Sequence, residues 1–230
     1  MLFGSSGIRR RYDETLIGLA LQVGKAVGAK ASRVTIGRDT RLTGQLMSAA
    51  FCAGALGAGA RIYDGGIAPT PSVAYSGRKT DAACMITASH NPEPYNGMKL
   101  FNPDGSSFSA AQQKEVEETL ADIPWGDWKK QGTSTRSYPV KEHSNAIASK
   151  IQVKEGLKVL VDCGNGAGSV ITPGLLSMMG TKTYAVNANI SGTFSRPSEP
   201  LPEHLPYIPS LIARTGSECA VIHDGDADRM

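Results

Sequence analysis

The sequence predicts an α/β protein made of two repeated three-layer α/β/α domains with mixed, largely parallel sheets. Short apolar strands alternate along the chain with segments of helical periodicity. The order strand, polar turn, helix and strand occurs at 34–63 and again at 159–186, a weak repeat of one βαβ unit. Between the two copies, the stretch 123–139 is rich in Pro, Trp, Gly, Ser and Thr. We therefore predict one domain at 1–138 and a second at 139–230.

The first domain is expected to begin with a helix, because apolar residues recur at helical spacing over 16–27. A short buried strand follows at 34–36. Thr43 can then cap a helix rich in small residues, which permit close packing on a sheet. The remaining expected elements are a strand at 61–64, a helix at 69–76, a strand at 82–87 and, after the capping residue Ser109, a helix through Leu120.

The second domain is expected to follow a helix at 141–151. A strand at 158–161 ends in the glycine-rich turn 162–168, which looks like a phosphate-binding loop. A dinucleotide site would need an acidic residue after the next strand, and Asn187 stands there instead. The other expected elements are a helix at 175–179, a strand at 183–186, a helix at 205–214 and a strand at 220–222.

Composition narrows the class of protein. Forty per cent hydrophobic and 20% charged residues are typical of a soluble globular chain, and no apolar run is long enough to cross a membrane. The net charge of +3, with scattered Lys and Arg, argues against a nucleic-acid partner. The N-terminus does not have the pattern of a signal peptide. Four widely spaced cysteines in apolar segments indicate reduced thiols, and we expect a cytoplasmic protein.

A polar turn after the strand at 82–87 is the first candidate for chemistry. It holds Ser89, His90 and Asn91, with Lys99 ten residues past the serine. Ligands of open α/β sheets bind at such strand ends. A serine that accepts and donates phosphate needs a nearby cation, donors for the phosphate oxygens and an acid/base group, and the last two could come from these neighbours. The alternative is a turn in which Ser89 and Asn91 only satisfy backbone groups.

An acidic loop at the end of the sequence is the second candidate. Asp224, Asp226 and Asp228 are spaced so that their oxygens can converge on one hard cation. An EF-hand is excluded because Arg229, and not glycine, follows the third aspartate. A solvated acidic turn is the alternative, although the loop follows a buried strand, where unpaired charges are costly.

Three segments resemble the signature loops of the α-D-phosphohexomutases, the family of phosphoglucomutase and phosphomannomutase. They are 87–92 (TASHNP), 96–99 (NGMK) and 224–229 (DGDADR). The resemblance implies that Ser89 is phosphorylated in the resting enzyme, and that Lys99 is an acid/base or phosphate-contacting group. It also implies Mg²⁺ as the cofactor, with the ligands Ser89 (through its phosphate), Asp224, Asp226 and Asp228.

The same resemblance implies that two arginines lie at the site. Segment 3–9 is similar to the family's opening motif, whose arginine, here Arg9, reaches the catalytic pocket; the family commonly has glycine where Arg10 stands. Arg229 matches an arginine near the phosphoserine. Segment 37–41 matches a strand-end motif that we interpret as structural or pocket-flanking. The implied catalytic residues are Ser89, Lys99, Arg9, His90 and Asn91.

The function implied is interconversion of hexose 1-phosphate and hexose 6-phosphate, with a phosphorylated hexose and a hexose 1,6-bisphosphate as partners. The family has four domains, and this chain resembles the first and most of the second. We therefore expect an incomplete second domain and poor activity of the chain by itself. We also expect a homo-oligomer formed through that domain, and the alternative is a monomer whose residues after about Pro200 exchange their amide hydrogens rapidly. The alternatives are a phosphoglucosamine mutase, a Mg²⁺-dependent phosphatase and a non-catalytic binding or scaffold protein derived from the fold.

Overall fold

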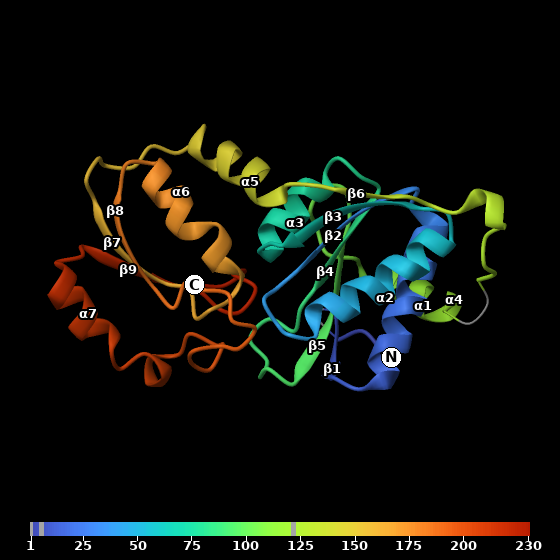
Figure 1. Ribbon diagram of the computed structural model, residues 1–230, viewed down its shortest axis with the longest axis horizontal. Coiled ribbons are helices and arrows are strands. Elements are labelled where there is room, and N and C mark those ends of the chain that lie inside the picture. Colours follow the sequence, from blue (N-terminus) through green and yellow to red (C-terminus); the bar gives the residue numbers. More distant parts are fainter. Residues whose placement is uncertain (1, 5–6, 121–122) are drawn as a thin grey trace.

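A six-stranded mixed sheet forms the centre of the N-terminal domain (Figure 1). The computed structural model describes residues 2–4, 7–120 and 123–230. The strand order is β1-β5-β4-β2-β3-β6, in which β4, β2, β3 and β6 run parallel and β5 pairs antiparallel with both β4 and β1. The strands are β1 (Ile8–Arg11), β2 (Arg33–Arg38), β3 (Arg61–Ile67), β4 (Ala82–Ile86), β5 (Tyr95–Phe101) and β6 (Ser134–Arg136).

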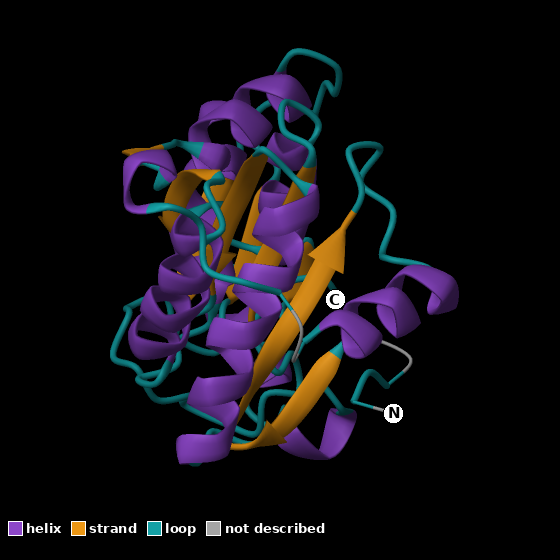
Figure 2. Cartoon of the chain, turned by 90° about the vertical axis from the view of Figure 1, so that its right-hand side faces the viewer, coloured by secondary structure: helices purple, strands orange, loops and turns teal. Residues whose placement is uncertain are grey.

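Helices cover both faces of this sheet (Figure 2). The central strand β4 shows why, since Cys84 and Ile86 belong to one apolar cluster while Ala83 and Met85 belong to another on the opposite face. The first cluster includes residues of α1 (Glu14–Lys30), α2 (Gly44–Gly57) and α4 (Ala110–Thr119). The second cluster is covered by α3 (Thr70–Gly77), which packs against α5 (Pro139–Ala148).

Glycines let α1 and α2 approach closely. A Cβ at Gly24 would lie 2.0 Å from the Phe51 carbonyl oxygen, and one at Gly54 would lie 2.0 Å from the Leu21 carbonyl oxygen. No side chain fits at either distance, so the small residues of α2 serve helix–helix contact as well as contact with the sheet.

The second domain is built on a three-stranded parallel sheet of order β8-β7-β9. Its strands are β7 (Lys158–Asp162), β8 (Lys182–Val186) and β9 (Cys219–Ile222), and its helices are α6 (Thr172–Met178) and α7 (Ile208–Thr215). Figure 1 shows this sheet between the two helices. Short 3₁₀ helices lie at η1 (Trp128–Lys130), η2 (Ala167–Val170) and η3 (Pro202–His204). The predicted class, two α/β/α domains with a mixed, mostly parallel sheet and a parallel one, is confirmed.

Three local predictions differ from the structure. Lys99 lies on strand β5 and not in the turn after Ser89. The sequence does not predict this strand because Gly97 interrupts its pattern. Glycine is needed there, since a Cβ at Gly97 would lie 1.8 Å from the Ile8 carbonyl oxygen of β1. Thr43 makes no capping hydrogen bond, since its hydroxyl accepts from Asn96 Nδ2 at 2.8 Å. Strand β6 lies in the stretch 123–139, where the sequence predicts the domain boundary and no strand.

Other local expectations are confirmed. Ser109 caps α4 and forms a capping box with Gln112. Within the described residues, no helix combines the length and the apolar character that a membrane span requires.

Candidate functional site

Ser89 lies in the loop between β4 and β5, at the carboxyl end of β4. Its side chain is fully buried, and its backbone φ of 52° falls in the left-handed region, which is costly for a residue with a Cβ. The Ser89 amide donates to Thr87 Oγ1 at 2.8 Å. Such a conformation persists only where its surroundings hold it, and the neighbouring side chains do so.

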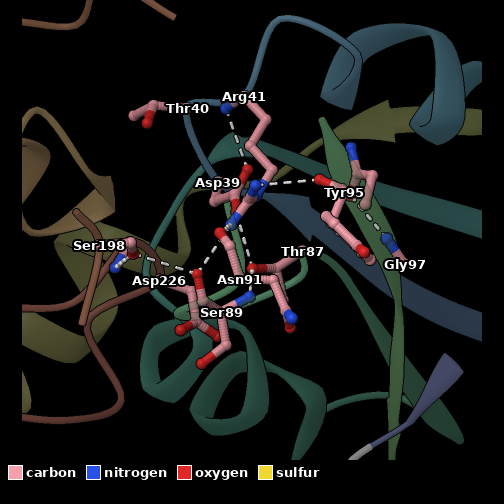
Figure 3. A network of polar contacts seen from close by, with 12 residues as sticks. Asp39, Thr40, Arg41, Thr87, Ser89, Asn91, Tyr95, Gly97, Ser198 and Asp226 are labelled. Atoms are coloured by element: carbon pink, nitrogen blue, oxygen red, sulfur yellow. Dashed lines mark hydrogen bonds and ion pairs between the residues drawn. The ribbon is translucent and has the colours of Figure 1, made fainter. Parts of the chain in front are cut away.

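Arg41 is the main support of this serine loop (Figure 3). Its buried guanidinium pairs with the buried carboxylate of Asp39, with 3.0 Å between Nε and Oδ2. The remaining nitrogens donate to four backbone carbonyls of the loop at 2.7 to 2.9 Å, those of Ser89, Asn91, Pro92 and Tyr95. Thr87 completes the link, since its hydroxyl donates to Asp39 Oδ2.

The acidic loop follows β9 and meets the serine loop. One carboxylate oxygen from each of Asp224, Asp226 and Asp228 lies within 4.8 Å of the others, and the first two residues are buried. The Ser89 hydroxyl donates to Asp224 Oδ2 at 3.0 Å. The fold thus joins the two candidate loops into one site, although 135 residues separate the two partners in sequence.

Lys99 enters the site from β5. Its Nζ lies 2.7 Å from Asp226 Oδ2 and 2.6 Å from Asp228 Oδ2. The Thr70 hydroxyl also donates to Asp226 Oδ2, whereas Asp226 Oδ1 is buried without a hydrogen-bond partner among the described residues. Three carboxylates against one ammonium leave two formal negative charges. The unpartnered oxygen, the surplus charge and the all-oxygen donor set fit a hard divalent cation.

Burial and mutual repulsion set the proton affinities of these carboxyls. Burial, followed by the negative charges of Asp226 and Asp228, raises the pKa of Asp224 to about 7. Burial also acts to raise the pKa of Asp226, but the charge of Lys99 and hydrogen bonds from Lys99 and Thr70 outweigh it and lower that pKa below its usual value. Asp224 is therefore the member of the cluster that gains a proton near neutral pH in the absence of a cation.

This raised pKa makes stability depend on pH. Between pH 5 and pH 8, folded Asp224 binds more protons than unfolded Asp224, whose pKa is the ordinary 3.8. Its contribution to the free energy of unfolding is complete below pH 3.8 and is lost as the pH rises through 7. We expect the free energy of unfolding, measured in urea with a chelator present, to decrease between pH 5 and pH 8 in the parent chain. Asp224→Asn should remove the part of this decrease that comes from Asp224 and leave the pH dependence that comes from the histidines. An identical pH dependence in both chains would contradict the assignment.

The other residues expected at the site lie around the serine loop. Arg9, on β1, donates from Nη1 to Asn91 Oδ1 at 3.4 Å. His90 is half-buried, and burial, followed by the charge of Arg229, lowers its pKa. Arg229 Nη1 lies 3.5 Å from Glu199 Oε1. Ser5 and Ser6 of the opening motif lie outside the described residues.

A cavity of about 520 Å³ lies beside the serine loop. One wall consists of residues 90–94 of this loop, including His90 and Asn91. The other wall comes from the second domain and includes Phe194, Arg196 and Glu199. The cavity is thus bounded by residues of both domains.

The glycines of the turn 162–168, whose composition suggests phosphate binding, lie close to other protein atoms. A Cβ at Gly164 would lie 3.1 Å from the Arg196 guanidinium, one at Gly166 would lie 2.7 Å from the Gly225 carbonyl oxygen, and one at Gly168 would lie 2.8 Å from the His223 ring. Protein atoms therefore fill the space beside these glycines, and the turn packs against the acidic loop.

Four supporting residues were not identified as site residues from the sequence. Asp39 and Arg41 had a signal, because charged residues follow a buried strand, but their pattern indicated only a structural or pocket-flanking role. Thr70 and Ser198 had none. Ser198 lies in an irregular segment, yet its buried hydroxyl contacts both loops of the site.

Comparisons with known proteins agree with this geometry. The family model of phosphoglucomutase/phosphomannomutase α/β/α domain I matches residues 1–126, and the model of domain II matches residues 140–230. The phosphoglucosamine mutases of Methanococcus maripaludis strain C7 and Methanococcus aeolicus are each 40% identical over 237 and 242 residues. Both alignments cover all of this chain and 53% of the relative, so the chain spans about half the length of these relatives.

A solved structure has the same fold. The chain superposes on a phosphoglucomutase/phosphomannomutase family protein from Burkholderia thailandensis with a TM-score of 0.87 and 26% identity, covering 98% of this chain and 52% of that one. The two family models together extend over most of the sequence, and the curated relatives align along all of it. The chain belongs to the phosphoglucomutase/phosphomannomutase family, the α-D-phosphohexomutases.

Proposed function

We propose that this chain carries the phosphoryl-transfer site of a phosphohexomutase, with Ser89 as the residue that holds the phosphoryl group. The observation that carries the proposal is the 3.0 Å hydrogen bond from Ser89 Oγ to Asp224 Oδ2. The bond joins a buried hydroxyl, which could act as a nucleophile, to a cluster of carboxylates that suits a divalent cation. The curated relatives are named phosphoglucosamine mutases, and we infer that amino-sugar phosphates belong to the substrate class.

The transfer runs in two matching steps. A free hydroxyl of a hexose monophosphate attacks the phosphorus of phosphorylated Ser89, the bond from phosphorus to Ser89 Oγ breaks, and the sugar becomes a bisphosphate. The attacking hydroxyl loses its proton to a base, and Ser89 Oγ gains one. After the bisphosphate turns round, Ser89 Oγ attacks the phosphorus of the other phosphoryl group and gives its proton to a base. The bond from that phosphorus to the sugar oxygen breaks, and the sugar oxygen gains a proton and leaves as the hydroxyl of the product monophosphate. Proton carriers in reach of the loop are His90 and Lys99.

Each contributing residue has a defined task. Asp224, Asp226, Asp228 and an oxygen of phosphorylated Ser89 would hold Mg²⁺, which neutralises charge on the phosphoryl group. The lowered pKa of His90 leaves its imidazole neutral at pH 7 and able to accept a proton. Lys99 keeps positive charge beside Asp226 and Asp228. Arg9 holds the Asn91 side chain and presents a second cation at the loop.

Mg²⁺ titration tests this function. Phosphate on Ser89 adds up to two negative charges and strong acceptor oxygens, so we expect the phosphorylated chain to bind Mg²⁺ about tenfold more tightly than the unmodified chain. Asp226→Asn should abolish measurable binding in both forms, because Asp226 supplies the buried unpartnered oxygen. Calorimetry gives both affinities.

Asp104→Asn is the matched control for this titration. Asp104 is an exposed aspartate in the turn after β5, and among residues 2–4, 7–120 and 123–230 its side chain bonds only with Ser106. Its substitution should leave the Mg²⁺ affinity unchanged. Equal affinities of the phosphorylated and unmodified chains, or retained binding in Asp226→Asn, would refute the proposed metal site.

A further inference from the structure

One hydroxyl, that of Ser198, connects the serine loop with the acidic loop. Ser198 Oγ donates to the Ser89 carbonyl oxygen at 3.2 Å and accepts from the Gly225 amide at 2.9 Å. Ser198 is buried, and Gly225 stands between Asp224 and Asp226. A Cβ at Gly225 would lie 2.9 Å from the Ser89 carbonyl oxygen, so the two loops approach too closely for a side chain between them.

The Ser89 carbonyl is held from two directions. Arg41 Nη2 donates to it at 2.8 Å from the first domain, while Ser198 donates from the second. Hydrogen bonds thus run without interruption from Asp39, at the end of β2, through Arg41, the Ser89 carbonyl and Ser198 to the Gly225 amide (Figure 3). Both contacts fall on the peptide of the residue with the strained φ.

The segment that carries Ser198 is itself held by contacts with both domains. Arg196 pairs with the buried carboxylate of Asp162, with 3.2 Å between Nε and Oδ2, and its Nη2 donates to the His223 carbonyl oxygen at 2.8 Å. The Phe194 ring lies 5.0 Å from the Arg41 guanidinium. Ser198 therefore has little freedom to follow either loop if that loop moves.

We infer that Ser198 is a positioning residue, whose hydroxyl sets the Ser89 side chain in register with the acidic loop. The inference rests on the proposed role of Ser89 as the phosphate carrier. Ser198 contacts the Ser89 carbonyl and not the reacting oxygen, so it acts through the backbone. Without this hydroxyl, Arg41 alone holds the Ser89 carbonyl and the Gly225 amide has no acceptor, so the distance between Ser89 Oγ and Asp224 is less well defined.

Residue-resolved amide hydrogen exchange tests the link without any ligand. In Ser198→Ala the Gly225 amide loses its acceptor, so we expect it to exchange about threefold to tenfold faster, the change that loss of one hydrogen bond produces. The Ser89 amide keeps its bond to Thr87 Oγ1 and should also exchange faster, because the Ser89 carbonyl loses one of its two donors and the loop is held less firmly. The matched control is Ser191→Ala, an exposed serine of the same segment whose hydroxyl, within the part of the chain that the structure describes, bonds only with Thr193. Unchanged exchange at Ser89 in Ser198→Ala would overturn the inference.

Two further measurements distinguish this inference from the proposed function. In the chain phosphorylated at Ser89, we expect Ser198→Ala to shift or broaden the phosphorus resonance and to weaken Mg²⁺ binding at least about threefold, with Ser191→Ala unchanged. If the parent chain accepts phosphate and binds Mg²⁺ while Ser198→Ala matches it in both, the positioning role is refuted. If the parent chain does neither, the proposed function fails, and the exchange experiment alone decides whether Ser198 links the loops.

Discussion

Ser89→Ala is expected to abolish the covalent attachment of phosphate to this chain. Incubation with glucose 1,6-bisphosphate should label the parent chain on the peptide that contains Ser89. Its hydroxyl donates to Asp224 at a strand end, and Lys99 pairs with the neighbouring Asp226 of the same acidic loop. The alanine variant lacks the only oxygen that the proposal allows to accept the phosphoryl group. Intact mass and peptide mapping measure the result.

The matched control for this labelling is Ser191→Ala, which should accept phosphate as the parent does. Ser191 is exposed, and its hydroxyl bonds with Thr193 and with no residue of the site among those described. Because Ser89 holds a strained φ that alanine also tolerates poorly, the circular dichroism of both variants should be compared first. Phosphate on another serine, with none on Ser89, would contradict the assignment of the nucleophile.

Arg41→Met should cost about 3 to 5 kcal/mol of unfolding free energy, the usual result when one partner of a buried ion pair is removed. The substitution leaves the Asp39 carboxylate buried and takes the donors from four carbonyls of the serine loop. Burial already raises the pKa of Asp39, against the lowering effect of Arg41. Without Arg41, folded Asp39 should bind a proton more strongly, so the loss of stability should be larger at pH 8 than at pH 5.

Arg33→Met is the control for this measurement. Arg33 forms an ion pair with Asp81 at 2.7 Å, but both side chains are substantially exposed. Such a pair contributes about 0 to 1 kcal/mol. Urea unfolding of both variants should therefore separate the buried pair from the exposed one. A loss below about 1 kcal/mol in Arg41→Met would show that the serine loop does not depend on this guanidinium.

Local sequence patterns predicted most of the elements and both chemical loops. Apolar periodicity identified α1 and α2, and a run of buried residues identified β4. Ser89 was singled out because a polar turn follows an apolar strand, and the three aspartates because like charges so close together need a neutralising partner. The elements could be predicted, and the two loops singled out as candidates, because each pattern depends on residues that are neighbours along the chain.

Strand β5 and the glycine-rich turn show which structural information cannot be read from residues that are neighbours along the chain. Gly97 looks like an interruption of a strand, yet it is required where β5 meets the backbone of Ile8. The glycines of 162–168 look like a phosphate cradle, yet the side chains of Arg196 and His223 and the backbone of Gly225 fill their space. In both cases a glycine is required because an element far away in sequence packs against it, so its structural role can be recognised only from the packing.

The sequence by itself determined the fold class, the candidate nucleophile and the acidic triad. The fold class follows from the periodicity of apolar residues, and the two candidate sites follow from short motifs. Only the tertiary structure decided that Ser89 faces Asp224, that Lys99 pairs with Asp226, and that Arg41 and Ser198 hold the Ser89 carbonyl. A buried polar group must find its hydrogen-bond partner within about 3 Å, wherever that partner lies along the chain. The separations here range from 48 to 135 residues, so the partner becomes known only when the first domain has folded and, for the longer separations, when the two domains have packed together.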